Sequence, residues 1–384
     1  MANVLVAMSG GVDSAVAAAL LVDQGHEVTG VHLKLAEVPL GDQVPGHGCC
    51  TLDDAQDARR AAQVLGIPFY VWDLTEAFRR EVQDPFAAEY AAGVTPNPCV
   101  SCNERVKYAA LLERATRLGF DALATGHHAR LRRDGEVVVE PGPGARLTRA
   151  ADARKDQSYV LYVASPDELA RTLLPVGELD KATVRTLAHD QGLRVADKPD
   201  SYDVCFVPDG DTAGYLADRL PTAPGDIVDV DGEVLGEHGG VWRYTVGQRR
   251  GLGLTTATHR RRFVVDLDAA SRTVVVGPRD ALACRWLAVD APSWAVPVPP
   301  RDGQRVRVQI RAHAPSVPAT LHLADDADGW RVTLDEPLHG VALGQAAVLY
   351  DPADEVCLGG GRIARAERPA GLPLARVGGT SDPG

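Results

Sequence analysis

The sequence predicts an α/β domain with a doubly wound parallel sheet, followed by a small mixed or β-rich domain and a C-terminal β-barrel. Three observations lead to this prediction. Strand patterns alternate with helical patterns over residues 1–130, a glycine-rich turn follows the first strand, and the pattern becomes mostly β from about residue 225. Alternating strands and helices are typical of a parallel sheet covered on both faces. Ligands of such sheets bind at the carboxyl ends of the strands.

The first domain is predicted to span residues 1–208. We expect strands over Val4–Met8, Glu27–Leu33, Phe69–Trp72 and Ala122–Ala124, and helices over Asp13–Gln24, Asp53–Leu65 and Val106–Leu118. Residues 41–49 and 93–101 are rich in glycine and proline and are predicted to be long loops at the carboxyl ends. Two more helices are expected over Asp167–Leu173 and Lys181–Gln191, with Ser165 and Asp180 as N-caps.

Residues 209–283 are predicted to form the middle domain and residues 284–366 the barrel. Asp231–Gly232 is a hairpin signal. The proline-rich residues 291–300 are expected to be a stiff linker. After them, apolar and polar residues alternate with period two, as in a small barrel or sandwich. The glycine- and proline-rich tail, residues 367–384, is predicted to fray.

Composition narrows the class of protein. The 384 residues are 45% hydrophobic and 24% charged, which is typical of globular proteins. We find no apolar run of membrane-spanning length and no secretory signal pattern, and seven cysteines argue against a disulfide framework. We therefore expect a cytoplasmic protein. The net charge of -12 disfavours nucleic acid as a partner, although it does not exclude a local basic face.

The turn after the first strand reads Ser-Gly-Gly-Val-Asp-Ser, residues 9–14. Its glycines allow backbone N–H groups to point inward, and these donors form an anion site together with the helix dipole. Asp13 would repel a bare phosphate, so we expect a magnesium ion on the phosphates. The turn lacks the lysine of a Walker loop, which fits an enzyme that releases pyrophosphate. The alternative is a plain turn with a helix cap.

Three cysteines lie in polar loops, namely Cys99, Cys102 and Cys205. A structural zinc site needs four ligands, and no second Cys-x-x-Cys or matching histidine pair is evident. A thiolate near Arg105 and a helix N-terminus would have a lowered pKa and would act as a nucleophile or sulfur carrier. Inert buried thiols are the alternative.

The remaining cysteines carry weaker signals. Cys284 and Cys357 lie in apolar, strand-like stretches and are assigned to packing. Cys49 and Cys50 are read either as a resolving pair or as incidental thiols of a glycine-rich loop.

The loop at residues 9–14 resembles the pyrophosphate loop (PP-loop) of ATP pyrophosphatases, whose domain is Rossmann-like. Further motifs make the chain similar to the tRNA-specific 2-thiouridylase family from the first strand to about residue 365. In chain order they are AMSGGVDS, CTLDDAQDA, TPNPCVSCN, ATGHHAR, KDQSYVLY, LPVGELDKATVR, CFVP, YTVGQRRGLG and EVCLGGGRI.

The resemblance implies a sulfurtransferase that modifies C2 of the wobble uridine (position 34) of tRNA. ATP would adenylate the uridine, and the implied ATP-binding residues are Ala7, Met8, Ser9, Gly10, Gly11, Val12, Asp13, Ser14, Leu33 and Gly126. Cys205 would carry a persulfide, and Cys102 would form a disulfide with it or otherwise free the sulfur. A persulfide-donating sulfur carrier or cysteine desulfurase and a reductant would then be partners.

The family resemblance also leaves a rival for sulfur delivery. Position 99 is an aspartate in some members and is Cys99 here. Three thiolates, from Cys99, Cys102 and Cys205, would suit a [4Fe-4S] cluster with one open iron.

The same resemblance implies a set of tRNA contacts. The implied residues are Asn97, Pro98, Cys99, His127, Lys155, Asp156, Gln157, Arg311, Ala312 and Gln345. Ala312 stands where the family has a tyrosine. Arg249, Arg250 and Arg260–Arg262 add a basic strip, so we expect tRNA affinity to fall with added salt. His127 and His128 are adjacent and should face opposite ways, which argues against a shared metal.

Two other functions remain alternatives. An ATP pyrophosphatase acting on a small metabolite, such as an amidating ligase, would need an ammonia source, and no such domain is evident. A non-catalytic nucleotide- or RNA-binding module would release no pyrophosphate.

Overall fold

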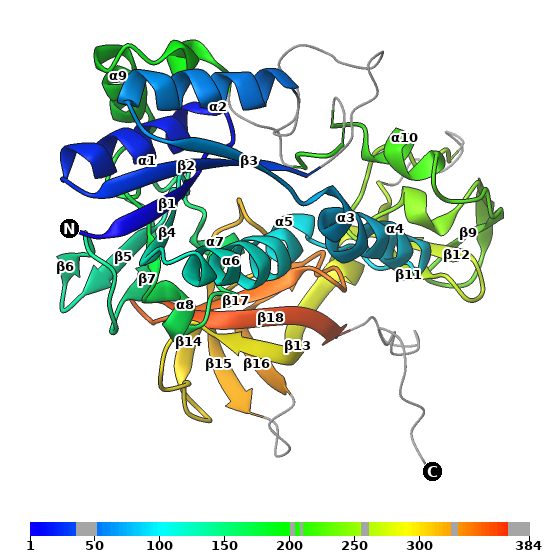
Figure 1. Ribbon diagram of the computed structural model, residues 1–384. Helices are drawn as coiled ribbons and strands as arrows, with labels where there is room; N and C mark the ends of the chain where they lie inside the picture. Colours follow the sequence, from blue (N-terminus) through cyan, green and yellow to red (C-terminus); the bar gives the residue numbers. More distant parts are fainter. Residues whose placement is uncertain (36–51, 200–203, 208–209, 255–260, 324–328, 368–384) are drawn as a thin grey trace.

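The central sheet has five parallel strands in the order β3-β2-β1-β4-β8 (Figure 1). The computed structural model describes residues 1–35, 52–199, 204–207, 210–254, 261–323 and 329–367. The strands are β1 (Asn3–Ala7), β2 (Glu27–Lys34), β3 (Phe69–Asp73), β4 (Ala122–Thr125) and β8 (Thr172–Leu173). This order confirms the predicted doubly wound parallel sheet.

Helices cover both faces of this sheet. In Figure 1, α1 (Val12–Asp23), α2 (Leu52–Leu65) and α9 (Lys181–Asp190) lie on one face. The other face carries α3 (Thr75–Phe78), η1 (Arg79–Gln83), α4 (Asp84–Ala91), α5 (Pro98–Ser101), the π-type helix η2 (Cys102–Leu112) and α6 (Glu113–Arg117). The small, buried alanines of α1 allow it to approach the sheet and both neighbouring helices closely.

The strand order reverses between β1 and β4. The chain moves from β1 outward through β2 to β3, and it then returns to the other side of β1 as β4. The loops that leave the carboxyl ends of β1 and β4 therefore diverge from one point, and such a switch point is where open α/β sheets bind ligands.

Smaller elements complete the first part of the chain. They are the three-stranded sheet β6 (Glu136–Val137), β5 (Arg130–Arg133) and β7 (Arg146–Thr148), the helices α7 (Ser158–Leu161) and α8 (Pro166–Leu169), and the 3-10 turn η3 (Arg194–Asp197). The side chains of Ser165 and Asp180 cap α8 and α9, which confirms both predicted caps.

Three local predictions were wrong. The helix expected over Asp167–Leu173 ends at Leu169, because Thr172 and Leu173 pair with β4 instead. The loop expected over residues 93–101 becomes helical at Pro98, where the Asn97 side chain supplies a cap. The helix expected from Val106 already begins at Cys102.

The middle part contains a four-stranded sheet in the order β10-β9-β12-β11. Its elements are α10 (Thr212–Ala217), β9 (Gly225–Asp229), β10 (Val234–His238), η5 (Val241–Arg243), β11 (Phe263–Asp268), β12 (Thr273–Gly277) and η6 (Arg279–Leu282). β9 and β10 are antiparallel, and Gly232 between them has a φ of +86°, which confirms the predicted hairpin.

The last part is a closed six-stranded barrel, as predicted. Its strands are β13 (Ala283–Trp294), β14 (Arg305–Gln309), β15 (Val317–Leu323), β16 (Gly329–His339), β17 (Ala346–Tyr350) and β18 (Cys357–Ala366). The linker expected over residues 291–300 was partly wrong, because β13 continues to Trp294 by pairing with β18. Of the predicted frayed tail, only Glu367 belongs to the described residues.

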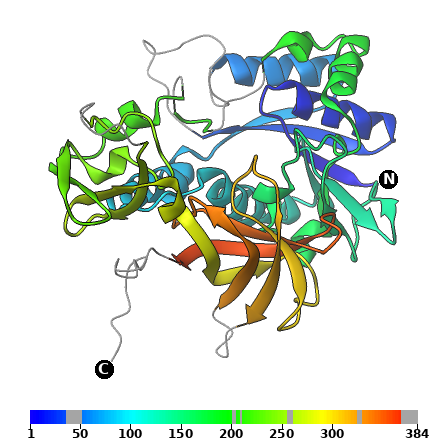
Figure 2. The ribbon, with the colours of Figure 1, turned by 180° about the vertical axis from the view of Figure 1, so that it is seen from behind.

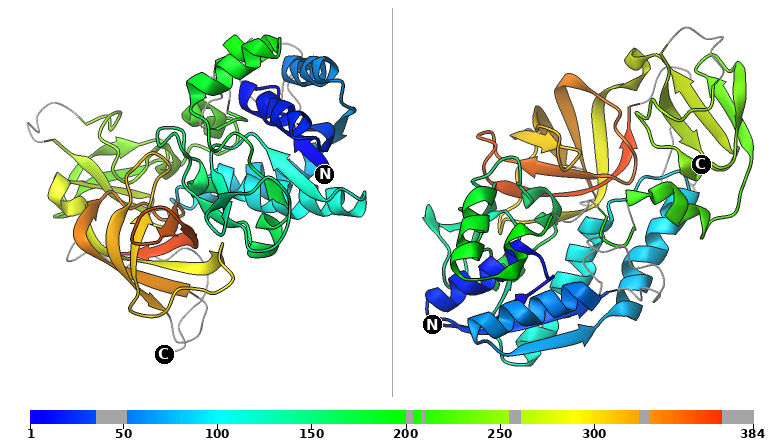
Figure 3. Two further views of the ribbon diagram at one scale, coloured as in Figure 1. Left: turned by 90° about the vertical axis from the view of Figure 1, so that its left-hand side faces the viewer. Right: turned by 90° about the horizontal axis from the view of Figure 1, so that it is seen from above.

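The barrel packs against the first part of the chain. Val348, Tyr350 and Cys357 of the barrel share one hydrophobic cluster with Phe78 and Cys102 of the helical layer. Figures 2 and 3 show the barrel against these helices and the middle part beside both. In the described segments, no helix combines the length and apolar character needed to cross a membrane.

Candidate active site

The glycine-rich turn lies at the switch point, between β1 and α1. Gly10 has a φ of +84°, and Gly11 is the N-cap residue of α1. The Ser14 hydroxyl accepts a hydrogen bond from the Ser9 N–H at 3.2 Å and donates one to the Gly11 carbonyl at 3.1 Å. These bonds hold the turn in place before the positive end of the helix dipole, an arrangement that suits an anion.

Two glycines of the site cannot be replaced without a clash. A Cβ atom on Gly10 would lie 2.3 Å from the Asp54 carbonyl oxygen of α2, and one on Gly126 would lie 2.5 Å from the Ser14 nitrogen. The turn therefore rests directly on the start of α2. The loop after β4 rests in the same way on the start of α1.

Asp13, in the first turn of α1, is bonded to two basic side chains. Lys181 Nζ donates to its two carboxylate oxygens at 2.7 and 2.8 Å, and His128 Nε2 lies 3.1 Å from Oδ1. Burial on its own raises the pKa of Asp13, but the hydrogen bonds from His128 and Lys181 and the charge of Lys181 together lower it below 3.8. Asp13 is thus ionised and already paired with a cation.

A second lysine reaches the turn from a different segment. Lys198 Nζ donates to the Gly10 carbonyl at 3.0 Å and to carboxylates of Asp54 and Asp57 on α2 at 2.7 and 2.8 Å. Burial alone lowers the pKa of Lys198, yet its bonds to the two aspartates raise it above the ordinary value. The turn itself contains no lysine, but Lys181 and Lys198 reach it from elsewhere in the chain, each paired with carboxylates.

Most of the remaining residues predicted to bind ATP are apolar and pack in the core beneath the turn. Met8 and Val12 pack in the core on one face of the sheet, and Leu33 packs in the core on the other face. Ala7 is half-buried at the end of β1. They can shape a nucleotide site but offer it few polar side-chain contacts.

The two predicted sulfur-handling cysteines both pack in or against the large hydrophobic cluster between the sheet, the helical layer and the barrel. Cys102 begins η2 and is buried in this cluster, while Cys205 is half-buried and packs against it. Phe206, next to Cys205, makes edge-to-face ring contacts with Phe78 at 5.6 Å and Phe86 at 5.3 Å. These contacts fix the Cys205 segment against the helical layer that contains Cys102.

The other thiols and Arg105 have different surroundings. Arg105 forms an ion pair with Glu81 at 3.5 Å, so its charge is partly compensated by that carboxylate. Cys284 and Cys357 are buried, which confirms their assignment to packing, and burial raises the pKa of the Cys357 thiol to about 12. Cys49 and Cys50 lie outside the described residues.

The sequence predicts two inorganic groups at this site, a magnesium ion and a [4Fe-4S] cluster. In the described part of the chain, no three His, Cys, Asp or Glu side chains gather so that they could hold a metal ion. Cys99, Cys102 and Cys205 therefore form no metal-ion site in the described residues, and the [4Fe-4S] cluster stays a prediction. Asp13 is not placed to coordinate a magnesium ion directly in this structure, because Lys181 donates hydrogen bonds to both of its carboxylate oxygens.

The residues Asn97, Pro98 and Gln345, predicted to contact tRNA, hold the Cys99 turn in place. The Asn97 side chain accepts from the N–H groups of Cys99 and Val100, and Pro98 is buried. Gln345 of the barrel donates to the carbonyls of Thr95 and Pro96 at 3.0 and 3.2 Å. These two hydrogen bonds join the barrel to the segment that carries Cys99 and Cys102.

The predicted tRNA loop Lys155-Asp156-Gln157 is held between the sheet and the barrel. The Asp156 carboxylate is 7% exposed and accepts from Arg149 at 2.9 Å and from Ser158 Oγ at 2.8 Å. Gln157 Oε1 accepts from the His128 N–H at 2.8 Å, and half-buried Lys155 donates its own N–H to the Asp152 carbonyl. Gln157 therefore positions His128, the partner of Asp13.

Arg311 and Ala312 follow β14 at the junction between the barrel and the middle part. Arg311 Nη2 donates to the Gly340 carbonyl at 2.6 Å, and Gly340 lies against Gly247 of the middle part. Ala312 packs against the hydrophobic cluster that contains Cys102.

The adjacent histidines face different partners, as expected. His127 Nδ1 lies 2.7 Å from Thr125 Oγ1, and its Nε2 lies 3.2 Å from Lys107 Nζ, whereas His128 meets Asp13. Burial, with a further contribution from the charges of Lys107 and His128, lowers the pKa of His127 well below 6.5. Neutral His127 thus accepts from Lys107 and donates to Thr125.

Only some arginines of the expected basic strip are exposed to solvent. Arg249 and Arg250 are exposed, and Arg262 pairs with the buried Asp229. Arg260 lies outside the described residues.

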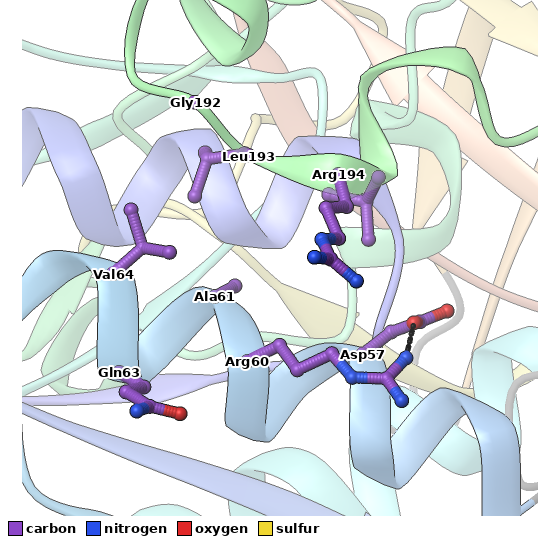
Figure 4. Close-up of a pocket in the computed structure, with 9 residues that line it drawn as sticks. Asp57, Arg60, Ala61, Gln63, Val64, Gly192, Leu193 and Arg194 are labelled. Carbon is purple, nitrogen blue, oxygen red and sulfur yellow. Dashed lines mark hydrogen bonds and ion pairs between the residues drawn. The ribbon is translucent and has the colours of Figure 1, made fainter.

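A separate pocket of about 250 Å³ lies between α2 and residues 192–195 (Figure 4). Asp57, Arg60 and Arg194 are its charged lining residues. Within the described chain, none of the residues predicted to bind ATP or tRNA lines it, so the switch point and not this pocket is the candidate active site.

Four charged residues of the site were not predicted from the sequence, namely Lys181, Lys198, Asp54 and Asp57. Lys181 lies in the motif LPVGELDKATVR, and Asp54 and Asp57 lie in CTLDDAQDA, whereas Lys198 lies in neither motif. A linear pattern does not show which lysine meets which carboxylate.

Three family models match successive parts of the chain. The family described as "tRNA methyl transferase HUP domain" matches residues 2–209, "tRNA methyl transferase PRC-barrel domain" matches residues 213–278, and "Aminomethyltransferase beta-barrel domain" matches residues 284–363. Among solved structures, a 4-thiouridine synthetase in complex with RNA and ATP is 17% identical, with a TM-score of 0.34 over 54% of this chain and 46% of that chain.

The curated relatives are similar over nearly their whole length. The chain is 53% identical to the tRNA-specific 2-thiouridylase MnmA of Salinispora tropica, over 94% of this chain and 99% of that protein. It is also 53% identical to the protein of that name from Acidothermus cellulolyticus, over 96% and 99% of the two chains. Because at least half of the aligned residues are identical along almost the full length of these proteins, the chain belongs to the tRNA-specific 2-thiouridylase family.

Proposed function

We propose that this chain replaces O2 of the wobble uridine, position 34 of tRNA, with sulfur in an ATP-dependent reaction. The names of its relatives support tRNA and uridine as the substrate. The observation that carries the proposal is the pairing of an anion site with two thiols. The turn at the switch point suits the phosphates of ATP, while Cys102 and Cys205, 103 positions apart, pack at one cluster.

The first half-reaction activates the base. O2 of uridine attacks the α-phosphorus of ATP, a phosphorus–oxygen bond forms, and pyrophosphate leaves. The turn with the N-terminus of α1 would bind the phosphates. Lys181 Nζ, now on Asp13, lies close enough to this helix end to balance the charge of the departing pyrophosphate.

The second half-reaction delivers sulfur. Cys205, loaded as a persulfide by a sulfur-carrier protein or cysteine desulfurase, attacks C2 with its terminal sulfur, and AMP leaves with the former O2. The Cys102 thiolate then attacks the Cys205 sulfur, which frees the thiolated base and leaves a Cys102–Cys205 disulfide. A dithiol reductant supplies two electrons to restore both thiols.

The two inorganic groups enter this proposal differently. Magnesium would accompany the ATP phosphates and screen their charge, while Asp13 remains with Lys181. A [4Fe-4S] cluster on Cys99, Cys102 and Cys205 stays a rival for sulfur delivery, and no step is derived through it. Iron and acid-labile sulfide in protein purified without oxygen would favour the cluster; the relay expects neither.

The experiment follows the two half-reactions separately. Unmodified tRNA, ATP, magnesium and a persulfide donor are incubated with the protein, and the products are measured as pyrophosphate and, by nucleoside mass spectrometry, as 2-thiouridine. We expect Cys205→Ser to release pyrophosphate without thiolation and Lys181→Met to lower both products by about 100-fold. Cys284→Ser, which keeps a hydroxyl to donate to the Trp286 carbonyl, is the control.

One result would redirect the assignment. If the wild-type protein releases pyrophosphate but thiolates no base with any donor, the turn activates another acceptor, and a ligase acting on a small metabolite becomes the better function.

A further inference from the structure

Lys107 is a half-buried lysine of η2 whose ammonium group reaches the carboxyl end of β4. Its Nζ lies 3.2 Å from His127 Nε2, and His127 Nδ1 lies 2.7 Å from the hydroxyl of Thr125, the last residue of β4. Burial lowers the pKa of His127 well below 6.5, so the ring is neutral and its Nε2 accepts from the ammonium. These bonds fix the Lys107 ammonium at the switch point without compensating its charge.

The charge of Lys107 has no carboxylate partner in the described segments. Lys181 and Lys198, the other lysines of the site, each bond carboxylates. Within those segments His127 is the one hydrogen-bond partner of Lys107 Nζ, which leaves two ammonium hydrogens for another acceptor. A half-buried cation without a counter-ion is costly for the fold, and such groups are concentrated where a charged ligand binds. An anionic ligand at this ammonium would supply the missing charge.

Lys107 and Lys181 approach the end of β4 from opposite faces of the sheet. His128 meets Asp13, the partner of Lys181, whereas the adjacent His127 meets Lys107. Lys181 begins α9, which lies with α1 on one face of the sheet, while η2 lies on the other face (Figure 1). A triphosphate bound at the switch point would therefore have one cation on each side.

The cysteine side of this site is the side of Lys107. Lys107 follows Cys102 by five positions, and one turn of a π-type helix joins residues five apart, so both side chains lie on one side of η2. In the proposed reaction, sulfur attacks C2 while the α-phosphate is still attached to its oxygen, so this phosphate lies near the cysteines. Pyrophosphate leaves in line with the attack on phosphorus and thus on the far side, toward α1 and Lys181.

We propose that Lys107 is a catalytic residue whose ammonium group binds the non-bridging oxygens of the α-phosphate. There it balances the negative charge that gathers on this phosphate when uridine O2 attacks, and again when AMP leaves as sulfur attacks C2. One cation serves both half-reactions, because the α-phosphate takes part in both. The inference rests on the proposed adenylation of uridine and names a residue that holds the phosphate of the adenylate.

The first test compares how AMP and pyrophosphate bind. Each competes with labelled ATP for the reduced full-length protein, with magnesium and without tRNA. Lys107→Met should raise the Kd for AMP by about tenfold, because a hydrogen bond to a charged group is lost, and should leave the Kd for pyrophosphate unchanged. Lys181→Met should show the reverse pattern. Lys107→Arg, which keeps the charge, should retain part of the affinity for AMP.

The second test measures the chemical step as single-turnover release of pyrophosphate with unmodified tRNA. Lys107→Met should lower this rate by about 100-fold. Arg117→Met is the matched control, since it removes an exposed cation of the same helical layer and should keep the wild-type rate.

Stability separates a catalytic role of Lys107 from a structural one. Because its charge is uncompensated, Lys107→Met should melt at the wild-type temperature or above it. If the methionine variant does not fold, Lys107→Gln, which keeps a donor for His127, replaces it in both tests. A Lys107 variant that binds AMP like the wild-type protein, or that loses AMP and pyrophosphate equally, would overturn the inference.

Failure of this inference is distinguishable from failure of the proposed function. If Lys107→Met thiolates tRNA as fast as the wild-type protein, the function stands and the role of Lys107 fails. If Lys107→Met selectively loses AMP but the wild-type protein thiolates no tRNA, the phosphate contact stands and the substrate fails. If the wild-type protein does not bind ATP, both fail.

Discussion

At the scale of single residues, the site is organised around charges that meet across long sequence distances. Asp13 pairs with a lysine 168 positions away, and the Gly10 carbonyl bonds a lysine 188 positions away. The turn at residues 9–14 is therefore not an isolated motif. Its electrostatic environment is completed by α9 and by the segment after η3, so a change in either should alter nucleotide binding.

The pH dependence of stability tests the Asp13 pair. Burial raises the pKa of Asp13, but the hydrogen bonds from His128 and Lys181 lower it by a larger amount. The pKa of Asp13 in the folded protein therefore lies below 3.8. The ionised carboxylate therefore stabilises the fold fully above 3.8, and this contribution is lost as the pH falls through the lower folded value. Asp13→Asn should cost about 1–3 kcal/mol of unfolding free energy at pH 7.

Urea unfolding of wild-type protein and Asp13→Asn at several pH values measures this difference. The difference in unfolding free energy between the two proteins should be constant near neutrality and should shrink below pH 3.8. Asn103→Asp adds a buried carboxyl whose charged form is disfavoured, so its stability difference from wild type should appear at a higher pH than the difference for Asp13→Asn. A gap for Asp13→Asn that stays the same at every pH would contradict the pairing.

At the scale of elements, the short helix α5 sets the direction in which Cys99 and Cys102 face. Asn97 caps it, and loss of a cap costs about 1 kcal/mol. Asn97→Asp keeps an acceptor for the Cys99 and Val100 N–H groups and places a negative charge at a helix N-terminus, whereas Asn97→Ala removes the cap. If capping is the main role of Asn97, the aspartate variant should keep most thiolation and the alanine variant should lose about tenfold.

If Asn97→Asp thiolates more slowly than Asn97→Ala, the main role of Asn97 is not capping. A contact with tRNA through the amide N–H would be lost in both variants, and a carboxylate near phosphate would repel it, so Asn97→Asp would then be the worse enzyme. Single-turnover thiolation rates, together with tRNA binding by both variants, separate the two roles.

How much of each element is predictable depends on where its stabilising contacts lie. Four of the five strands of the sheet, the caps at Ser165 and Asp180 and the hairpin at Gly232 follow from neighbouring residues, and they were predicted. The strand Thr172–Leu173 exists because it pairs with Leu123 and Ala124, and nothing in its local sequence indicates this. The loop residues of the site were likewise predicted, whereas the partners of Asp13 and Gly10 come from distant segments.

At the scale of the whole molecule, the barrel supports the active-site loops. Arg149 lies over the Tyr350 ring at 3.6 Å, bonds Asp156 and Gln309, and thereby joins the loop of Lys155–Gln157 to β14 and β17. Gln345 makes a second join to the segment before Cys99. Motifs that the sequence suggested as RNA contacts thus also connect the domains, because a linear motif does not reveal whether its residues face solvent or another domain.

The net charge of -12 makes tRNA binding depend on a limited set of cations. Each phosphate contact changes the slope of log affinity against log salt by about 0.7 to 0.9. Arg249 and Arg250 are exposed on the middle part, so Arg249→Ala/Arg250→Ala should flatten this slope by about 1.4 to 1.8. The matched control is Arg301→Ala/Arg331→Ala, which removes two exposed arginines from the barrel. Filter binding of one tRNA between 50 and 300 mM salt, about a sixfold range, gives both slopes. A control slope that falls as much as that of the first pair would mean that the attraction is spread over the surface and does not come from the middle part.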